Sequence, residues 1–285
     1  MSNQGLIPIK PHSRRKYTIL TKYLDTCEKF SNKYQNFAYI DTHGGTGEVF
    51  DVMSQKSCPG SVLTAAKIMP SFPCYVVEID PDHYTLLKQH AEGYPHIHLF
   101  NGDCNEKIDE ILRKIPMGQN FVFCFVDPDG LVYRRGTTVC LQLTSETVDK
   151  IAKFPRTEIL LNLSVEGIMR EAGCVCKNPK DSASQKMEEC LIRLFGSDKW
   201  KQLDPGDYKG FLRLYINERL KPNYQFKGAI LIRDSQTRGP LYYLAYGSKY
   251  WLGGKIMRDV MANEWGYKSP WIDQTHPSTE FIFED

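Results

Sequence analysis

Short apolar runs and longer amphipathic segments alternate along the first 165 residues of the chain. The apolar runs predict buried strands at Phe37–Asp41, Cys74–Ile79, Ile97–Asn101, Phe121–Val126 and Thr157–Leu163. Apolar residues at helical spacing predict helices at 14–30, 61–69, 81–90, 103–115 and 144–154. Strands that are apolar throughout are typical of a parallel sheet with both faces covered by helices. The pattern therefore predicts an α/β fold.

The remaining residues follow a less regular pattern. Helices are expected at 182–195, 208–219 and 251–263, and loops at 48–60 and 166–180. Two apolar runs, Gln225–Arg233 and Gly239–Tyr246, flank a polar turn and predict an antiparallel hairpin at the edge of the sheet. Ser13 is expected to cap the first helix.

Length and composition favour one globular unit. The 285 residues are 41% hydrophobic and 25% charged, which is ordinary for a soluble domain. We expect a single domain over 1–285, with a cofactor-binding core at 12–165 and, at 166–285, a helical insertion followed by edge strands. The apolar runs are too short to span a membrane, and no secretory signal opens the chain, so a cytoplasmic location is expected.

The nine cysteines give little sign of a metal site. Seven are scattered singly, and Cys174 and Cys176 are separated by one residue rather than by the two of a metal-binding knuckle. We therefore predict no metal. A nuclease is disfavoured for the same reason, because the acids show no clustered metal ligands.

Acidic and glycine residues follow four successive strands, where open α/β sheets place their ligands. Glu78 could accept hydrogen bonds from two ribose hydroxyls, Asp103 could meet an adenine amino group, and Asp127-Pro128 could lie beside a reacting methyl group. The predicted cofactor-binding residues are Asp41, His43, Gly45, Gly47, Glu78, Ile79, Asp103 and Cys104. A nicotinamide dehydrogenase is disfavoured, because Phe50 stands where the dinucleotide fingerprint has its third glycine.

This order of strand-end features resembles the class I methyltransferases, which implies a Rossmann-like fold and S-adenosylmethionine as cofactor. Four stretches are similar to motifs of the three-Cys-motif partner family: Tyr39–Gly47, His12–Lys16, Val126–Gly130 and Leu241–Lys249. Members of that family are methyltransferase-like and are often paired with a three-cysteine partner protein. The resemblance thus adds that protein as an expected partner.

Two residues depart from the family pattern. Asp129 stands where the family has Phe, and where amino-methylating enzymes have a proline before the aromatic residue that stacks on an extruded base. Tyr133 could replace this stacking platform. His43 replaces another Phe and places a titratable side chain in the glycine-rich turn, Thr42–Gly47.

The motifs and charges together predict an S-adenosylmethionine-dependent methyltransferase acting on an RNA or DNA base. Asp127 and Pro128 are the predicted catalytic residues, and the substrate-binding residues are Lys16, Asp129, Tyr133 and Arg134. A basic N-terminal segment could contact phosphates. Aromatic residues that could stack on bases are Tyr215, Tyr224, Tyr242, Tyr243, Tyr246, Tyr250 and Trp251. The alternative is a catalytically inactive Rossmann-like module that binds the cofactor or a partner.

Overall fold

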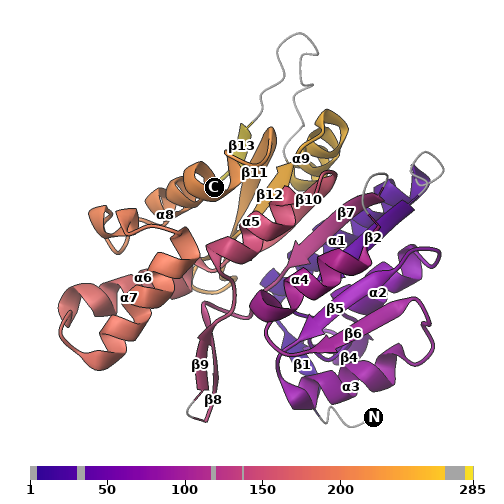
Figure 1. Ribbon diagram of the computed structural model, residues 1–285, viewed down its shortest axis with the longest axis horizontal. Helices are drawn as coiled ribbons and strands as arrows, with labels where there is room; N and C mark the ends of the chain where they lie inside the picture. Colours follow the sequence, from indigo (N-terminus) through magenta and orange to yellow (C-terminus); the bar gives the residue numbers. More distant parts are fainter. Residues whose placement is uncertain (1–4, 31–35, 117–119, 137, 267–279, 285) are drawn as a thin grey trace.

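The computed structural model describes residues 5–30, 36–116, 120–136, 138–266 and 280–284. Their centre is an eight-stranded sheet in the order β6-β5-β2-β7-β10-β12-β11-β13 (Figure 1). The strands are β2 (Asn36–Asp41), β5 (Cys74–Glu78), β6 (Ile97–Asn101), β7 (Asn120–Val126), β10 (Thr157–Leu163), β11 (Phe226–Arg233), β12 (Pro240–Ser248) and β13 (Glu280–Phe283). Of these, β12 alone runs antiparallel to its neighbours. The predicted mostly parallel sheet is confirmed.

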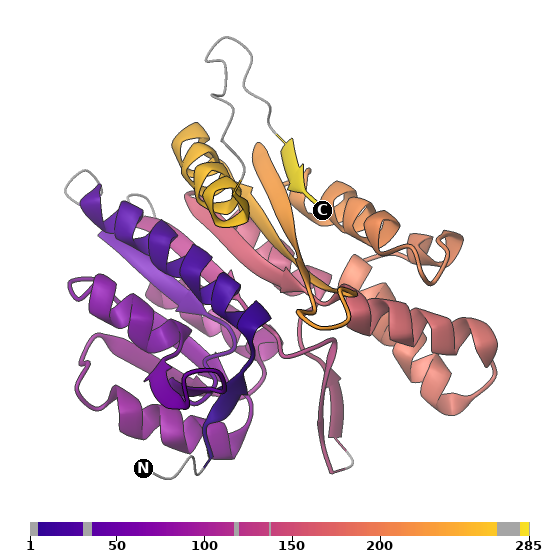
Figure 2. The same cartoon turned by 180° about the vertical axis from the view of Figure 1, so that it is seen from behind.

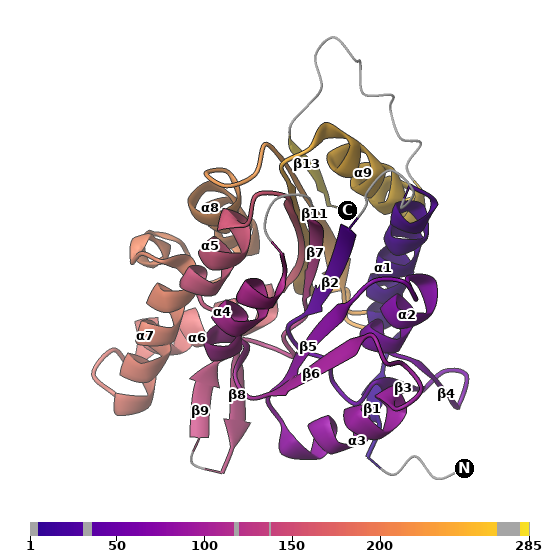
Figure 3. The same cartoon turned by 45° about the vertical axis from the view of Figure 1, so that its right-hand side comes forward.

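Alternate residues of each strand face opposite helical layers, as the pleat requires. In β2, Phe37 and Tyr39 pack with one layer, while Ala38 and Ile40 pack with the other. The first layer consists of α1 (Pro11–Lys29), α2 (Ser61–Ile68), α3 (Pro81–Ala91) and α9 (Trp251–Trp265). The second begins with α4 (Cys104–Lys114) and α5 (Ser145–Lys153). Figure 3 shows the sheet between the layers, and Figure 2 shows α1 and α9 side by side on one face.

A helical addition lies between β10 and β11. It comprises α6 (Val165–Lys177), α7 (Ser182–Phe195), η2 (Lys199–Gln202), α8 (Tyr208–Tyr215) and η3 (Ile216–Leu220). The loop predicted at 166–180 is wrong, because most of it is α6. Ser164 caps this helix by accepting a hydrogen bond from the Gly167 amide, and Ile168, Ala172 and Val175 give it a buried face. Gly167 and Gly173 interrupt the helical spacing of these apolar residues, so the sequence did not indicate a helix.

Two small sheets were not predicted: one includes the expected loop at 48–60, and the other lies at 132–141, to which no element was assigned. β1 (Ile7–Ile9) pairs with β3 (Glu48–Asp51), which forms a hairpin with β4 (Lys56–Pro59). β8 (Val132–Arg135) and β9 (Thr138–Leu141) form a second hairpin, which projects from the sheet (Figures 1 and 2). Such short, half-exposed strands lack the apolar alternation that sequence prediction needs.

Two further expectations need adjustment. The predicted hairpin is present as β11 and β12, but β13 pairs with β11 and forms the outer edge of the sheet. Ser13 does not cap α1: the helix begins at Pro11, and Lys10 occupies the N-cap position. Proline suits a first helical position, because the amide it lacks would have no helical partner there. No helix in the described ranges is long and apolar enough to cross a membrane.

A buried carboxyl group ties the far end of the sheet to both neighbouring helices. Glu158, at the start of β10, accepts hydrogen bonds from the hydroxyls of Tyr23 in α1 and Ser248 at the end of β12. A Cβ atom on Gly253 would lie 1.7 Å from Glu158 Oε1, so only glycine lets α9 pack there. Lys249 donates to the carbonyls of Ala152 and Phe154 at the end of α5. These contacts give Ser248 and Lys249, the last two residues of the Leu241–Lys249 stretch, a structural role.

From the burial of the Glu158 carboxyl group we predict a specific pH dependence of the protein's stability. Burial raises the pKa of Glu158 from 4.5 to about 7. Between these values the folded chain holds a proton that the unfolded chain releases, so the stability contributed by Glu158 falls as pH rises. Relative to Glu158→Gln, the wild-type unfolding free energy should fall by up to about 3 kcal/mol over this range, measured by urea denaturation. Glu28→Gln, at an exposed site on α1, is the control. A pH-independent difference between wild type and Glu158→Gln would contradict the prediction.

Candidate functional site

Four neighbouring parallel strands, β5, β2, β7 and β10, bring their carboxyl ends to one edge of the sheet. β2 is the first of them in the chain and lies between β5 and β7, so the strand order reverses there, which is where open α/β sheets bind ligands. A pocket of about 670 Å³ opens at this edge. The predicted residues that line it are Lys16, His43, Gly45, Glu78, Ile79, Asp127, Pro128, Asp129, Tyr133 and Arg134.

The glycine-rich turn after β2 is fixed by hydrogen bonds to both neighbouring strands. The Thr42 amide donates to the Phe125 carbonyl at 3.1 Å, and the Gly44 amide donates to the Val77 carbonyl at 2.8 Å. A Cβ atom on Gly44 would lie 2.4 Å from Val76 Cγ1, so the turn can sit this close to β5 only with glycine there. The turn is thereby held flat against the edge of the sheet.

Glu78 projects from the end of β5 and is 6% exposed. Its two carboxylate oxygens accept hydrogen bonds from the backbone amides of Gly45 and Asp80, each at 2.7 Å. Burial raises the pKa of Glu78, while these amides oppose the rise. Each carboxylate oxygen has further lone pairs, so the group can still accept hydrogen bonds from a ligand in the pocket.

Four predicted cofactor residues do not line the pocket: Asp41, Gly47, Asp103 and Cys104. Asp103 caps α4 by accepting from the Asn105 amide. The Cys104 thiol donates to the Gln142 carbonyl at 3.2 Å, and the Gly47 carbonyl accepts from the Gly60 amide at 2.7 Å. Cys104 and Gly47 are thereby hydrogen-bonded to two residues that line the pocket, Gln142 and Gly60.

Asp41 lies beneath the glycine-rich turn and is fully buried. It accepts hydrogen bonds from the Tyr39 hydroxyl at 3.0 Å and the His43 amide at 3.1 Å. Burial raises its pKa to about 7. Asp41 therefore shapes the turn rather than facing a ligand.

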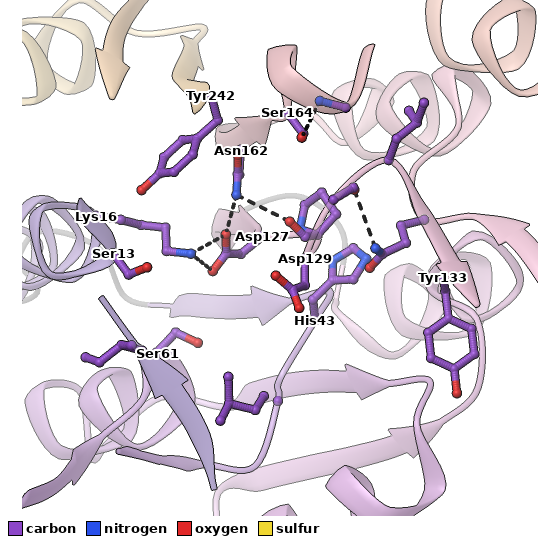
Figure 4. A pocket seen from close by; sticks show the side chains of 18 of the residues that line it. Ser13, Lys16, His43, Ser61, Asp127, Asp129, Tyr133, Asn162, Ser164 and Tyr242 are labelled. Carbon is purple, nitrogen blue, oxygen red and sulfur yellow. Dashed lines mark hydrogen bonds and ion pairs between the residues drawn. The ribbon is translucent and has the colours of Figure 1, made fainter. Parts of the chain in front are cut away.

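The opposite side of the pocket is built around Asp127. Lys16 Nζ lies 2.7 Å from Asp127 Oδ1 and 2.5 Å from Oδ2, and both side chains are nearly buried. Figure 4 shows Lys16 reaching from α1 toward this carboxylate, with the Asn162 side chain above it. A buried charge requires a partner, and Lys16 supplies it.

Asn162 is a site residue that the sequence analysis missed. Its Nδ2 donates to Asp127 Oδ1 at 3.0 Å and to the Pro128 carbonyl at 3.3 Å. Those two acceptors fix the orientation of the amide, since the flipped amide would place oxygen against oxygen. The signal was present as a polar residue near the carboxyl end of β10, in the otherwise apolar Leu160–Leu163.

The predicted substrate residues lie on different sides of the pocket. Asp129 is exposed, and Lys16 faces Asp127. The Tyr133 hydroxyl donates to Asp80 at 3.0 Å, and Figure 4 shows Tyr133 far from Lys16. Arg134 is exposed on the β8–β9 hairpin. Tyr133 therefore stands on the Glu78 side, away from the position after Asp127-Pro128 where the stacking residue of amino-methylating enzymes is expected.

Most of the predicted stacking aromatics are core residues. Tyr215, Tyr224, Tyr243 and Tyr246 are almost fully buried, so the proposed stacking role is wrong for them. Tyr250 and Trp251 lie at the other end of the sheet. Tyr242 alone among the seven lines the pocket, and its ring centre is 5.9 Å from Lys16 Nζ.

The N-terminal residues form one wall of the pocket, which the sequence did not predict. Ile7, Pro8 and Ile9 of β1 line the pocket together with His12 and Ser13. A Cβ atom on Gly45, whose φ is 61°, would lie 3.1 Å from Ile7 Cδ1. The pairing of β1 with β3 thus holds an apolar wall against the glycine-rich turn.

This arrangement fits an adenosine-bearing ligand. The pocket volume lies in the usual range for cofactor sites. It offers a buried carboxylate for hydroxyl groups at Glu78 and a close backbone at Gly45. Within the described ranges, no group of three or more His, Cys, Asp or Glu residues lies together in a way that could hold a metal ion.

The chain is similar in structure to protein LPL1258 from Legionella pneumophila, at 13% identity over 89% of this chain and 92% of that one, with a TM-score of 0.50. An O-methyltransferase from Bacillus cereus, in complex with SAH, matches at 14% identity over 85% of this chain and 82% of that one, with a TM-score of 0.44. No protein-family model and no curated protein sequence matches the chain. The strand order, with one antiparallel strand in an otherwise parallel sheet covered by helices, gives the chain a Rossmann-like α/β fold.

His43 is predicted to remain uncharged at neutral pH. Its Nδ1 lies 2.8 Å from Thr42 Oγ1, and burial lowers its pKa from 6.5 to about 4. The imidazole signal in an NMR titration should therefore move only below pH 6.5 and have its midpoint near 4. A His43 midpoint at 6.5 would contradict the prediction.

Proposed function

We propose that the chain is an S-adenosylmethionine-dependent methyltransferase. The observation that supports this most strongly is that the glycine-rich turn, Glu78 and Asp127 face one pocket at the reversal of strand order in a class I methyltransferase fold. In this proposal Glu78 holds the ribose hydroxyls, and Gly45 and Ile79 contact the adenosine. The bound cofactor supplies an electrophilic methyl group.

The residues around Asp127 suit an amine acceptor. Methyl transfer from a sulfonium is a direct displacement, so the protein acts mainly by positioning donor and acceptor. Asp127 can accept one N–H of the acceptor and the Pro128 carbonyl can accept a second. Asn162 contacts both groups and holds them in place. An acceptor must therefore displace Lys16 or Asn162 from these oxygens.

A nucleic acid base is the proposed acceptor. Two exposed cationic residues, Arg134 and Arg170, line the pocket, and Arg15, Arg233 and Arg238 line a neighbouring hollow that also contains Asp234 and Glu264. Cationic groups around an acceptor site suit a phosphate backbone. Tyr242 provides an aromatic face within the pocket. A three-cysteine partner protein stays a further expectation from the sequence motifs.

An inactive cofactor-binding or partner-binding module is the second candidate. Asp129 and Gly130 leave no aromatic side chain directly after Asp127-Pro128, and Tyr133 is bonded to Asp80 instead. Such a module would bind the cofactor without turnover. Binding and transfer therefore have to be measured separately.

Cofactor binding should depend on Glu78 and much less on Asp103. Glu78→Ala removes the carboxylate that faces the pocket, and we expect it to weaken S-adenosylhomocysteine binding at least about tenfold, the effect of losing hydrogen bonds to a charged group. Asp103→Ala, which removes only a helix cap, is the matched control, because both residues are strand-end acids. Isothermal titration calorimetry measures both. Equal losses would contradict the roles assigned here.

Methyl transfer should require Asp127. The full chain, incubated with radiolabelled S-adenosylmethionine and total RNA or total DNA, should label one of them. Asp127→Ala should abolish the label while S-adenosylhomocysteine binding stays within a few fold of wild type, and Asp127→Asn tests the charge at constant size. Absence of label from both nucleic acids would argue against this substrate class. Loss of binding together with transfer would make Asp127 a cofactor or folding residue.

A further inference from the structure

A primary amine of the chain itself already occupies the proposed acceptor position. Lys16 Nζ contacts both oxygens of Asp127, the carboxylate to which the acceptor amine is assigned. The Lys16 side chain is only 11% exposed, yet it lines the same pocket as Gly45 and Glu78. Of the lysines in the described part of the chain, Lys16 alone lines this pocket. An amine in contact with Asp127 is the arrangement proposed above for the acceptor.

Two aromatic rings flank the same nitrogen. Lys16 Nζ lies 5.5 Å from the centre of the Tyr17 ring and 5.9 Å from that of Tyr242. The Tyr242 ring is held in place by its hydroxyl, which donates to the His12 carbonyl. Aromatic faces together with a carboxylate are the surroundings in which proteins bind methylated ammonium groups. The site can therefore accommodate Lys16 after the addition of a methyl group.

We propose that Lys16 is a methyl acceptor in its own active site. The inference rests on the proposed function, because it needs S-adenosylmethionine in the pocket. The Lys16 ammonium first releases a proton, which Asp127 can receive and pass to solvent. The nitrogen lone pair then forms a bond to the methyl carbon as the carbon–sulfur bond breaks. The electron pair of the broken carbon–sulfur bond stays on sulfur. The products are methyl-lysine, S-adenosylhomocysteine and one proton.

Self-methylation would change the acceptor site without removing its charge. A methylated Lys16 stays cationic, so its attraction to Asp127 persists, but it has one N–H fewer to share between the two carboxylate oxygens. The added methyl group also takes space beside Tyr242. Modification of Lys16 would thus alter how readily an outside acceptor reaches Asp127.

Mass spectrometry of the intact chain tests the proposal. The full-length protein is incubated with S-adenosylmethionine that carries a deuterated methyl group, and peptide mapping locates the label. We expect the label on Lys16, with a rate that increases with pH because the ammonium must lose a proton. Asp127→Asn should slow labelling by about a hundredfold, the usual contribution of a positioned proton acceptor. Lys16→Arg should remove the label from this peptide.

Lys22 is the internal control. It lies on the same helix, is about half exposed and pairs with Glu264, so Lys22→Arg should leave labelling of Lys16 unchanged. Equal labelling of Lys22 and Lys16, or equal labelling of heat-denatured protein, would overturn the proposal by showing uncatalysed reaction. An unchanged Lys16 rate in Asp127→Asn would overturn it as well.

A second readout needs no cofactor. Acetylation of the cofactor-free chain by an amine-reactive ester should modify Lys16 more slowly than Lys22, and Asp127→Asn should accelerate modification of Lys16. An equal acetylation rate for Lys16 and Lys22 would contradict the contact between Lys16 and Asp127. If the chain transfers label to RNA or DNA but Lys16 stays unlabelled at high pH, self-methylation fails and the proposed function stands. Absence of binding would refute both.

Discussion

Three carboxyl groups lie at one edge of a parallel sheet, and each receives its hydrogen bonds from different donors. Asp41 is held by a tyrosine hydroxyl and the His43 amide, and Glu78 by two backbone amides. Asp127 is held by Lys16 and Asn162. Buried carboxyl groups without such donors would be costly. The glycine-rich turn, the path of α1 and the position of β10 all supply these donors, so the same requirement shapes the pocket.

The parts of this edge that lie on long apolar strands could be predicted from the sequence. Continuous apolar runs mark β2, β5, β7 and β10, and the residues that follow them in the chain must emerge at one edge. That logic locates Glu78 and Asp127 in the pocket. It could not separate a residue facing a ligand from one capping a helix, because an acid after a strand serves either purpose. Asp103 caps α4 in the structure, and its contact with an adenine amino group stays a prediction.

Other parts depend on tertiary contacts that leave little trace in local sequence. β1 exists because it pairs with β3, and α6 forms despite two glycines because its apolar face packs against the core. The basic N-terminal segment suggested phosphate contacts. Three of its charges are instead used within the chain, since Arg14, Lys16 and Lys22 pair with acids far away in the sequence.

The central claim is that this edge holds one adenosine-bearing molecule with its sulfur directed toward Asp127. A crystal structure with S-adenosylhomocysteine tests it most directly. The account predicts the ribose hydroxyls on Glu78 and the sulfur on the side of the pocket where Lys16 and Asp127 meet. Ligand bound at the opposite end of the sheet, near Tyr250 and Trp251, or an adenosine that does not contact Glu78, would contradict it.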